Sequence, residues 1–133
     1  MSESMKIPNS VLIASLLAST VSSAAAQGKS VTSRAQQDSI LKHWLTVLDA
    51  NQQKHYMQRG TYTTDQQTLG MSRKPFDVEL SIVFAGGRSW WAIGSLGPAK
   101  CAVWAGTRAD FAAAPTTGKT EPTKERQVIC DPL

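Results

Sequence analysis

Apolar residues recur at three- and four-residue steps through the stretch from Ser30 to Arg59, which contains neither Gly nor Pro. This spacing predicts an amphipathic helix with a single apolar stripe. The stripe comprises Ile40, Leu41, Trp44, Leu45, Leu48, His55 and Tyr56. Gly60 is expected to end the helix, because glycine readily takes the left-handed conformation that follows helix C-termini.

The pattern changes to alternation after the helix. From Phe76 to Ala85, one face carries apolar side chains and the other carries Asp77, Glu79 and Ser81, which predicts a half-buried strand. The apolar face comprises Phe76, Val78, Leu80, Ile82 and Phe84. "GGR", residues 86–88, is typical of a hairpin turn. Further strands are expected at Ser89 to Leu96, Cys101 to Gly106 and Gln127 to Asp131. The stretch from Thr107 to Arg126 is expected to be a loop that is mobile at its centre.

Together these elements predict an α+β fold, in which one long N-terminal helix packs on an antiparallel meander of about four strands. The large apolar side chains of the helix need a partner surface, and the first strand supplies one. We therefore expect Leu41, Trp44, Leu45 and Leu48 to be buried against Val78, Leu80 and Ile82. Each such burial contributes roughly 1.5–3 kcal/mol.

The N-terminal segment is uncharged from Ile7 to Gly28, with its most apolar part from Val11 to Val21. Residues 1–28 follow a signal-peptide pattern, since "AAA" at residues 24–26 fits a small-residue cleavage site before Gln27. Alternatively, Ile7 to Ala26 remains attached as a membrane anchor. Both alternatives predict export across a bacterial inner membrane, with residues 29–133 forming a periplasmic domain.

The start of the helix is also open on the sequence alone. Ser30, Thr32 or Ser33 could cap a separate helix. Equally, one rod of about 50 residues could continue from the apolar segment, since Gly28 is the only breaker between them.

Cys101 and Cys130 are the only cysteines of the chain. An even number of cysteines in an exported protein favours a disulfide, which here would close a loop of about 30 residues. We expect their Cα atoms to lie about 4.4–6.8 Å apart. A metal site is disfavoured because neither His43 nor His55 has ligand spacing to the cysteines or to the other histidine.

The charge and the motifs narrow the range of functions. The formal net charge of +4 is scattered, and basic residues are not clustered with stacking aromatics, so nucleic acid is an unlikely partner. No Gly-x-Ser-x-Gly or phosphate-binding motif occurs in the sequence. We therefore expect a protein that is not an enzyme and carries no cofactor.

Adjacent tryptophans provide the strongest indication of a contact surface. Trp90 and Trp91 point to opposite faces of the predicted strand, so one of them is expected to face solvent, the helix edge or a partner. Trp104 could lie across from one of them. An exposed Trp beside Arg88 and Lys100 would form a protein or membrane contact. These five residues are our candidate interface.

The stretch "ANQQKHYMQRGTYTTDQQTLG", residues 50–70, resembles type IV pilins and the pseudopilins of type II secretion. Those proteins commonly end a long N-terminal helix with an aromatic residue, a Gly, then Tyr-Thr, and a Leu-Gly further on. Their C-terminal cysteine pair beside the sheet is also similar. The resemblance implies a helical spine packed on a four-stranded antiparallel sheet. Nothing between Met1 and Thr20 matches the pilin peptidase site, and the calcium loop of some pseudopilins has no counterpart in the widely spaced acids after Thr107.

Three functional hypotheses follow. The first is a non-enzymatic, pilin-like structural protein that contacts other subunits in a filament or membrane-associated assembly. The second is an accessory subunit that braces an inner-membrane complex, for example a photosynthetic or respiratory one. The third is a soluble periplasmic binding module.

Overall fold

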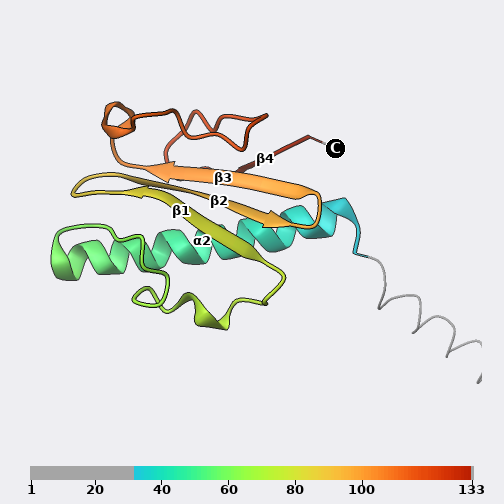
Figure 1. Cartoon of the computed structure of the whole chain (residues 1–133), viewed down its shortest axis with the longest axis horizontal. Coiled ribbons are helices and arrows are strands. Elements are labelled where there is room, and N and C mark those ends of the chain that lie inside the picture. Colours follow the sequence, from blue (N-terminus) through green and yellow to red (C-terminus); the bar gives the residue numbers. More distant parts are fainter. Residues whose placement is uncertain (1–31, 133) are drawn as a thin grey trace, which may run out of the picture. The chain divides into compact units, whose positions relative to one another are not determined.

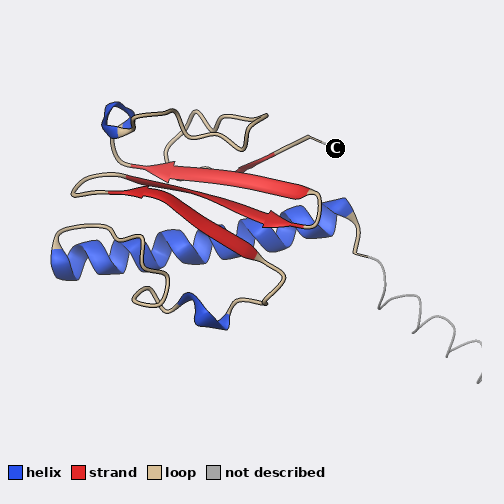
Figure 2. Cartoon of the chain, in the orientation of Figure 1, coloured by secondary structure: helices blue, strands red, loops and turns tan. Residues whose placement is uncertain are grey.

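A computed structural model describes residues 32–132. The expected signal peptide or anchor, including Ile7 to Ala26, therefore lies outside the described residues. The described elements are α2 (Arg34–Arg59), η2 (Met71–Arg73), β1 (Glu79–Ala85), β2 (Trp90–Leu96), β3 (Ala99–Ala105), η3 (Arg108–Asp110) and β4 (Ile129–Cys130). The four strands form one antiparallel sheet in the order β1-β2-β3-β4, so the predicted α+β meander is confirmed (Figure 2).

Helix α2 ends as predicted but begins later. Gly60 has a φ of 75°, and its amide donates to the Tyr56 carbonyl at 2.7 Å, which closes the last turn. Thr32 and Ser33 are not helical. The alternative of one continuous rod is therefore wrong at this point, and Ser33 occupies the position where serine commonly precedes a helix.

The core lies between α2 and one face of the sheet, as Figure 1 shows. Leu41, Leu45 and Leu48 are fully buried there, together with Val78 and Leu80 of the facing strand region. Trp44 and Ile82 pack against this cluster but are only partly buried. The burial of the three leucines is confirmed, but the expectation that the first strand is their main partner is corrected, because the helix lies mainly over β2 and β3.

Gln52 extends the buried face of α2 by one further turn. Its side chain is completely buried, and it donates to the Thr63 carbonyl at 2.7 Å while accepting from the Thr63 amide at 3.1 Å. A buried amide is stable only when its polar atoms are hydrogen-bonded. This pair of bonds therefore fixes the loop after Gly60 to the helix, a role that the sequence pattern did not reveal.

Strand β1 is shorter than expected and changes face near its end. Its pairing with β2 runs from Ile82 opposite Ala92 to Phe84 opposite Trp91, so Val83 is the extra residue of a β-bulge. The bulge reverses the alternation. Phe84 therefore lies on the face away from α2, which corrects the expectation that it shares a face with Leu80.

The disulfide between Cys101 and Cys130 is confirmed, with the sulfur atoms 2.03 Å apart. The two residues are direct partners across β3 and β4, and their Cα atoms are 3.9 Å apart. This separation is shorter than the predicted range, because directly opposed residues of an antiparallel pair approach closely. The disulfide therefore holds the two-residue strand β4 to the sheet.

Residues 107–126, which we call the C-terminal strap, form a third layer over the sheet face opposite α2 (Figure 1). The expected loop is present, with η3 as its one helical turn, but Pro115, Thr117 and Pro122 are buried, so its centre is packed against the rest of the described chain. Thr117 also donates to the Asp131 carboxylate in a buried hydrogen bond. The chain thus covers both faces of its own sheet.

Candidate interaction surfaces

The outer face of the sheet carries an aromatic cluster. Trp91 and Trp104 are direct partners across β2 and β3. Phe111 of the strap meets Trp104 edge-on at 6.2 Å between ring centroids and meets Phe84 in the same way at 5.5 Å. The guanidinium of Arg108 lies 5.7 Å from the Trp104 ring centroid, within the range of a cation–π contact.

The strap covers this cluster through specific hydrogen bonds. The Trp104 indole Nε1 donates to the Pro122 carbonyl at 2.8 Å, and the Arg126 amide donates to the Trp104 carbonyl at 2.8 Å. As a result Trp91 is 7% exposed and Trp104 is 6% exposed. On the opposite face, Trp90 is fully buried near Tyr62. The expectation that Trp90 or Trp91 faces solvent is therefore wrong, because the strap supplies the cover that the sequence pattern did not show.

The two basic residues of the candidate interface lie at opposite ends of the sheet. Arg88 is in the β1–β2 hairpin, whereas Lys100 pairs with Ser95 near the β2–β3 turn. Seven-residue strands are about 20 Å long, so the structure does not bring these two side chains together. Both residues remain predicted contact positions, each at a separate place on the surface.

Arg88 belongs to a polar cluster at the hairpin end. Its side chain is 74% exposed and pairs with the Asp110 carboxylate at 3.1 Å. The buried Ser89 hydroxyl donates to Asp110 at 2.6 Å and accepts from the Thr107 amide at 2.8 Å. Gly106 allows this close approach, since a Cβ at that position would lie 2.3 Å from the Arg88 carbonyl oxygen. The cluster fixes the start of the strap to the hairpin.

A second ion pair connects the other end of the strap to the helix. Arg126 pairs with Asp49 of α2, and Arg126 also has a left-handed backbone conformation with a φ of 64°. Burial raises the pKa of Asp49, although the Arg126 guanidinium opposes this effect. Arg126 thus contacts both β3, through its amide and the Trp104 carbonyl, and α2, through Asp49, so it fixes the end of the strap to both elements.

Among residues 32–132, the most exposed large apolar residue lies in a different region, the loop that leads into β1. Phe76 is 95% exposed. The Pro75 carbonyl accepts from the Val78 amide at 3.1 Å, which closes a turn with Phe76 and Asp77 at its corners. The expectation that Phe76 is a core-facing strand residue is wrong, because this turn precedes the strand. Pro75 is the sequence signal that could have indicated it.

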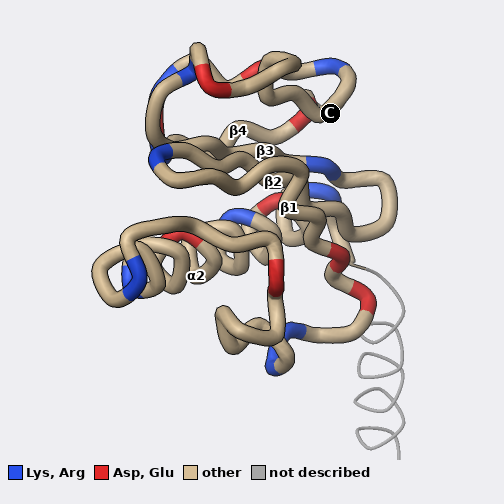
Figure 3. The backbone as a smooth tube through the Cα atoms, turned by 60° about the vertical axis from the view of Figure 1, so that its left-hand side comes forward, with Lys and Arg blue, Asp and Glu red and all other residues tan. Residues whose placement is uncertain are grey.

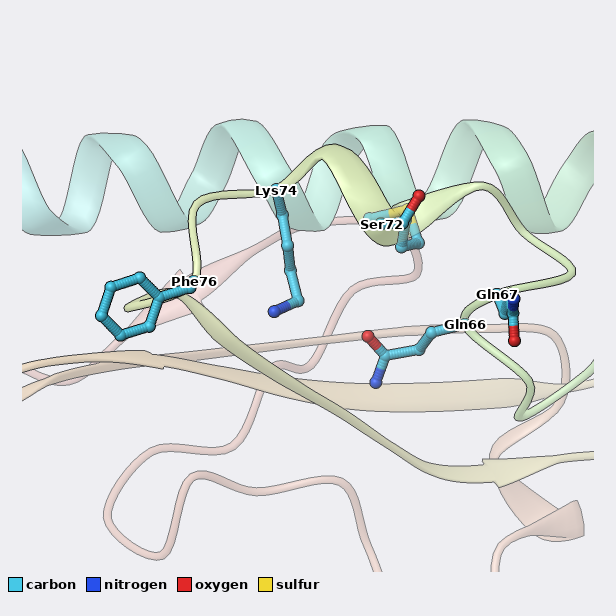
Figure 4. A pocket seen from close by; sticks show the side chains of 6 residues that line it. Gln66, Gln67, Ser72, Lys74 and Phe76 are labelled. Carbon is cyan, nitrogen blue, oxygen red and sulfur yellow. The ribbon is translucent and has the colours of Figure 1, made fainter.

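A groove adjoins Phe76, and we call it the Phe76 groove. Its volume is about 370 Å³, and it is lined by Gln66, Gln67, Met71, Ser72, Lys74 and Phe76. Figure 4 shows Phe76 at one end of the lining and Gln67 at the other, with Lys74 and Gln66 between them. Met71 is buried and contributes an apolar floor.

The Phe76 groove lies along the free edge of the sheet, because β1 is the outer strand. Two lining side chains form hydrogen bonds with backbone carbonyls there. The Gln66 amide donates to the Leu80 carbonyl at 2.6 Å, and the Lys74 ammonium donates to the Val78 carbonyl at 2.7 Å. Side chains that bond to edge carbonyls hinder the addition of another strand. The groove is therefore better suited to side-chain contacts than to strand pairing.

Among the described residues, one group of side chains could in principle hold a metal, and one groove carries basic side chains that could attract an anion. Within residues 32–132, Asp38 lies close enough to Cys101 and Cys130 to suggest a metal cluster, but both sulfur atoms are bonded to each other. A polar groove of about 290 Å³ is bordered by the basic side chains Lys54, His55 and Arg59. His55 Nδ1 is already 2.7 Å from the Thr61 carbonyl oxygen.

No family model matches this chain, and no curated protein sequence matches it. In the described part of the chain, no helix has both the length and the apolar character needed to cross a bilayer.

Proposed function

We propose that this protein is an exported, non-enzymatic, pilin-like structural protein that contacts other protein subunits in a filament or a membrane-associated assembly. One observation supports this proposal most directly. A helix of 26 residues packs along one face of an antiparallel meander whose last strand is linked to the preceding one by a disulfide. This is the arrangement that the resemblance of residues 50–70 to pilins implies.

The way in which the sheet is covered indicates where such contacts would be made. Helix α2 covers one face and the C-terminal strap covers the other, so the large aromatic residues of both faces are already used within the chain. Contacts to other subunits then fall to loops, to the β1 edge and to the segment outside the described residues. In this proposal, the segment from Ile7 to Ala26 anchors the protein in a membrane or packs in the core of a filament.

A charge in the apolar segment tests this assignment. We expect Leu17→Lys to abolish assembly of the full chain, as measured by native electrophoresis and electron microscopy, because a lysine is costly in an apolar helix core or a bilayer. Ala35→Lys is the matched control, since Ala35 is exposed on α2 and the size and charge change are comparable.

The possible outcomes separate the hypotheses. Fibres that are lost with Leu17→Lys and kept with Ala35→Lys would support the filament form of the proposal. Loss from a complex of fixed size with other proteins would instead support the accessory subunit. If the mature protein begins at Gln27 by intact-mass measurement and both variants behave like the parent, the structural proposal is refuted and a soluble binding module is favoured.

A further inference from the structure

We propose that residues 73–79, which we call the Phe76 turn, form a self-association site whose occupant is a second copy of this chain. In this arrangement, Phe76 of each copy enters the Phe76 groove of the other about a two-fold axis. The proposed function leaves contacts to the loops and the β1 edge without naming a residue there; this inference names one such site and its occupant, and it holds or fails independently of the apolar segment.

The first argument is the exposure of Phe76. A phenylalanine that is 95% exposed at the corner of a turn contributes almost nothing to its own fold. Exposed aromatic residues beside a groove are typical energetic centres of protein contacts. The groove begins at the Phe76 ring itself, and Met71 provides an apolar floor. When a side chain and a groove are neighbours on one surface, a two-fold axis beside them allows the side chain of each copy to enter the groove of the other copy.

The second argument is the order of charges around Phe76. Arg73 and Lys74 precede it, whereas Asp77 and Glu79 follow it. Figure 3 shows basic and then acidic positions along the loop that leads into β1. A two-fold axis near Phe76 places the basic half of one copy opposite the acidic half of the other. The surface is therefore complementary to itself, which favours a second copy over a partner of uniform charge.

These charges take part in none of the ion pairs of the described part of the chain, although Lys74 donates a hydrogen bond to the Val78 carbonyl. The ion pairs among residues 32–132 involve Arg34, Arg88 and Arg126. Arg73, Asp77 and Glu79 are exposed and take no part in those pairs. Because Gln66 and Lys74 already bond to carbonyls at the β1 edge, association through side chains is favoured over pairing of two β1 strands.

The test uses the full chain and locates the contact directly. Unlabelled and ¹⁵N-labelled protein are mixed and treated with a zero-length carbodiimide, which joins a lysine to a carboxylate in direct contact. We expect mixed-isotope links between Lys74 of one copy and Asp77 or Glu79 of the other. The yield of these links is the readout, because it reports contact at the Phe76 turn rather than association elsewhere.

Charge reversal provides the decisive comparison. Arg73→Glu and Asp77→Arg should each lower the yield between like copies by about tenfold, because each places like charges opposite one another. A mixture of the two variants should recover the parental yield, because the altered charges are then opposite in sign. If the mixture links no better than either variant alone, the two-fold arrangement is wrong.

A paired substitution tests the apolar part. Phe76→Ser should reduce the yield about tenfold or more, whereas Met57→Ser, at a residue that is 85% exposed on α2, should leave it unchanged. Both variants should keep the parental melting temperature, since neither side chain is buried. A Phe76→Ser protein that cross-links like the parent overturns the proposal, and so does the absence of mixed-isotope links in the parent.

Discussion

Gly94 of β2 lies close to side chains of both the helix and the neighbouring strand, and this contact yields a quantitative prediction. A Cβ placed on Gly94 would lie 3.2 Å from a terminal methyl of Leu41 and 3.2 Å from one of Leu80, with Leu45 at 3.4 Å. The first two distances are shorter than ordinary van der Waals contact. Gly94→Ala therefore overpacks the core, and we expect it to cost about 1–3 kcal/mol of unfolding free energy.

Removal of Leu41 should relieve that overpacking. Leu41→Ala alone deletes a fully buried side chain and should cost about 2–5 kcal/mol, because it leaves a cavity. In the double variant the new alanine methyl occupies part of the cavity and loses one of its two closest contacts. The double variant should therefore be more stable than the sum of the single effects predicts, by about 0.5–3 kcal/mol.

Urea unfolding of the oxidised protein measures this coupling, provided that the slope of free energy against urea is the same in all variants. The control is the pair Gly94→Ala and Leu48→Ala. Leu48 is equally buried but is not among the side chains nearest to Gly94, so that pair should be additive. If Leu41 and Gly94 are also additive to within about 0.5 kcal/mol, the proposed contact between α2 and β2 is wrong.

Four further predictions follow from the described contacts. Leu45→Ala should cost about 2–5 kcal/mol in the same assay, whereas Ser39→Ala, on the exposed side of α2, should be nearly neutral. Trp91→Ala should cost about 3–5 kcal/mol, since the ring is buried beneath the strap, and a parental melting temperature would contradict this. Replacement of both Cys101 and Cys130 by Ser should lower stability by roughly 3–4 kcal/mol on the loop-entropy estimate, and the reduced parent should match this variant. Burial raises the pKa of Asp49 in the folded state, so the contribution of Asp49 to stability is greatest below its unfolded pKa and declines as pH rises through its folded pKa. Asp49→Asn should remove this part of the pH dependence of unfolding free energy, and an unchanged pH dependence in the variant would refute the prediction.

The elements that depend on local periodicity could be predicted from the sequence. The stripe containing Leu41, Leu45 and Leu48 predicted the helix and its buried face, and Gly60 predicted its end. The cysteine pair was predictable because two cysteines leave only one possible intramolecular bridge. These features need only the spacing of residues along one element or a count of one residue type.

The features that were not predicted depend on contacts between distant segments. The bulge at Val83 moves Phe84 to the other face, and alternation alone contains no sign of it. The burial of Trp91 and Trp104 depends on the strap, whose residues show no periodicity that places them over the sheet. The exposure of Phe76 is the local exception: it follows from the turn between Pro75 and Val78, which Pro75 could have indicated.

The small size of β4 determines when the chain can finish folding. Strands β1, β2 and β3 are joined by short turns, so their pairing closes only short loops. Strand β4 pairs through two residues, and one of them, Cys130, is separated from its partner by 29 positions in sequence. Its contacts are the least local of the sheet, and such contacts form late. We therefore expect β4 to dock after the strap that covers the tryptophan face, so that a chain truncated before Cys130 would retain the strap but leave Cys101 and Ala102 of β3 without their partner strand.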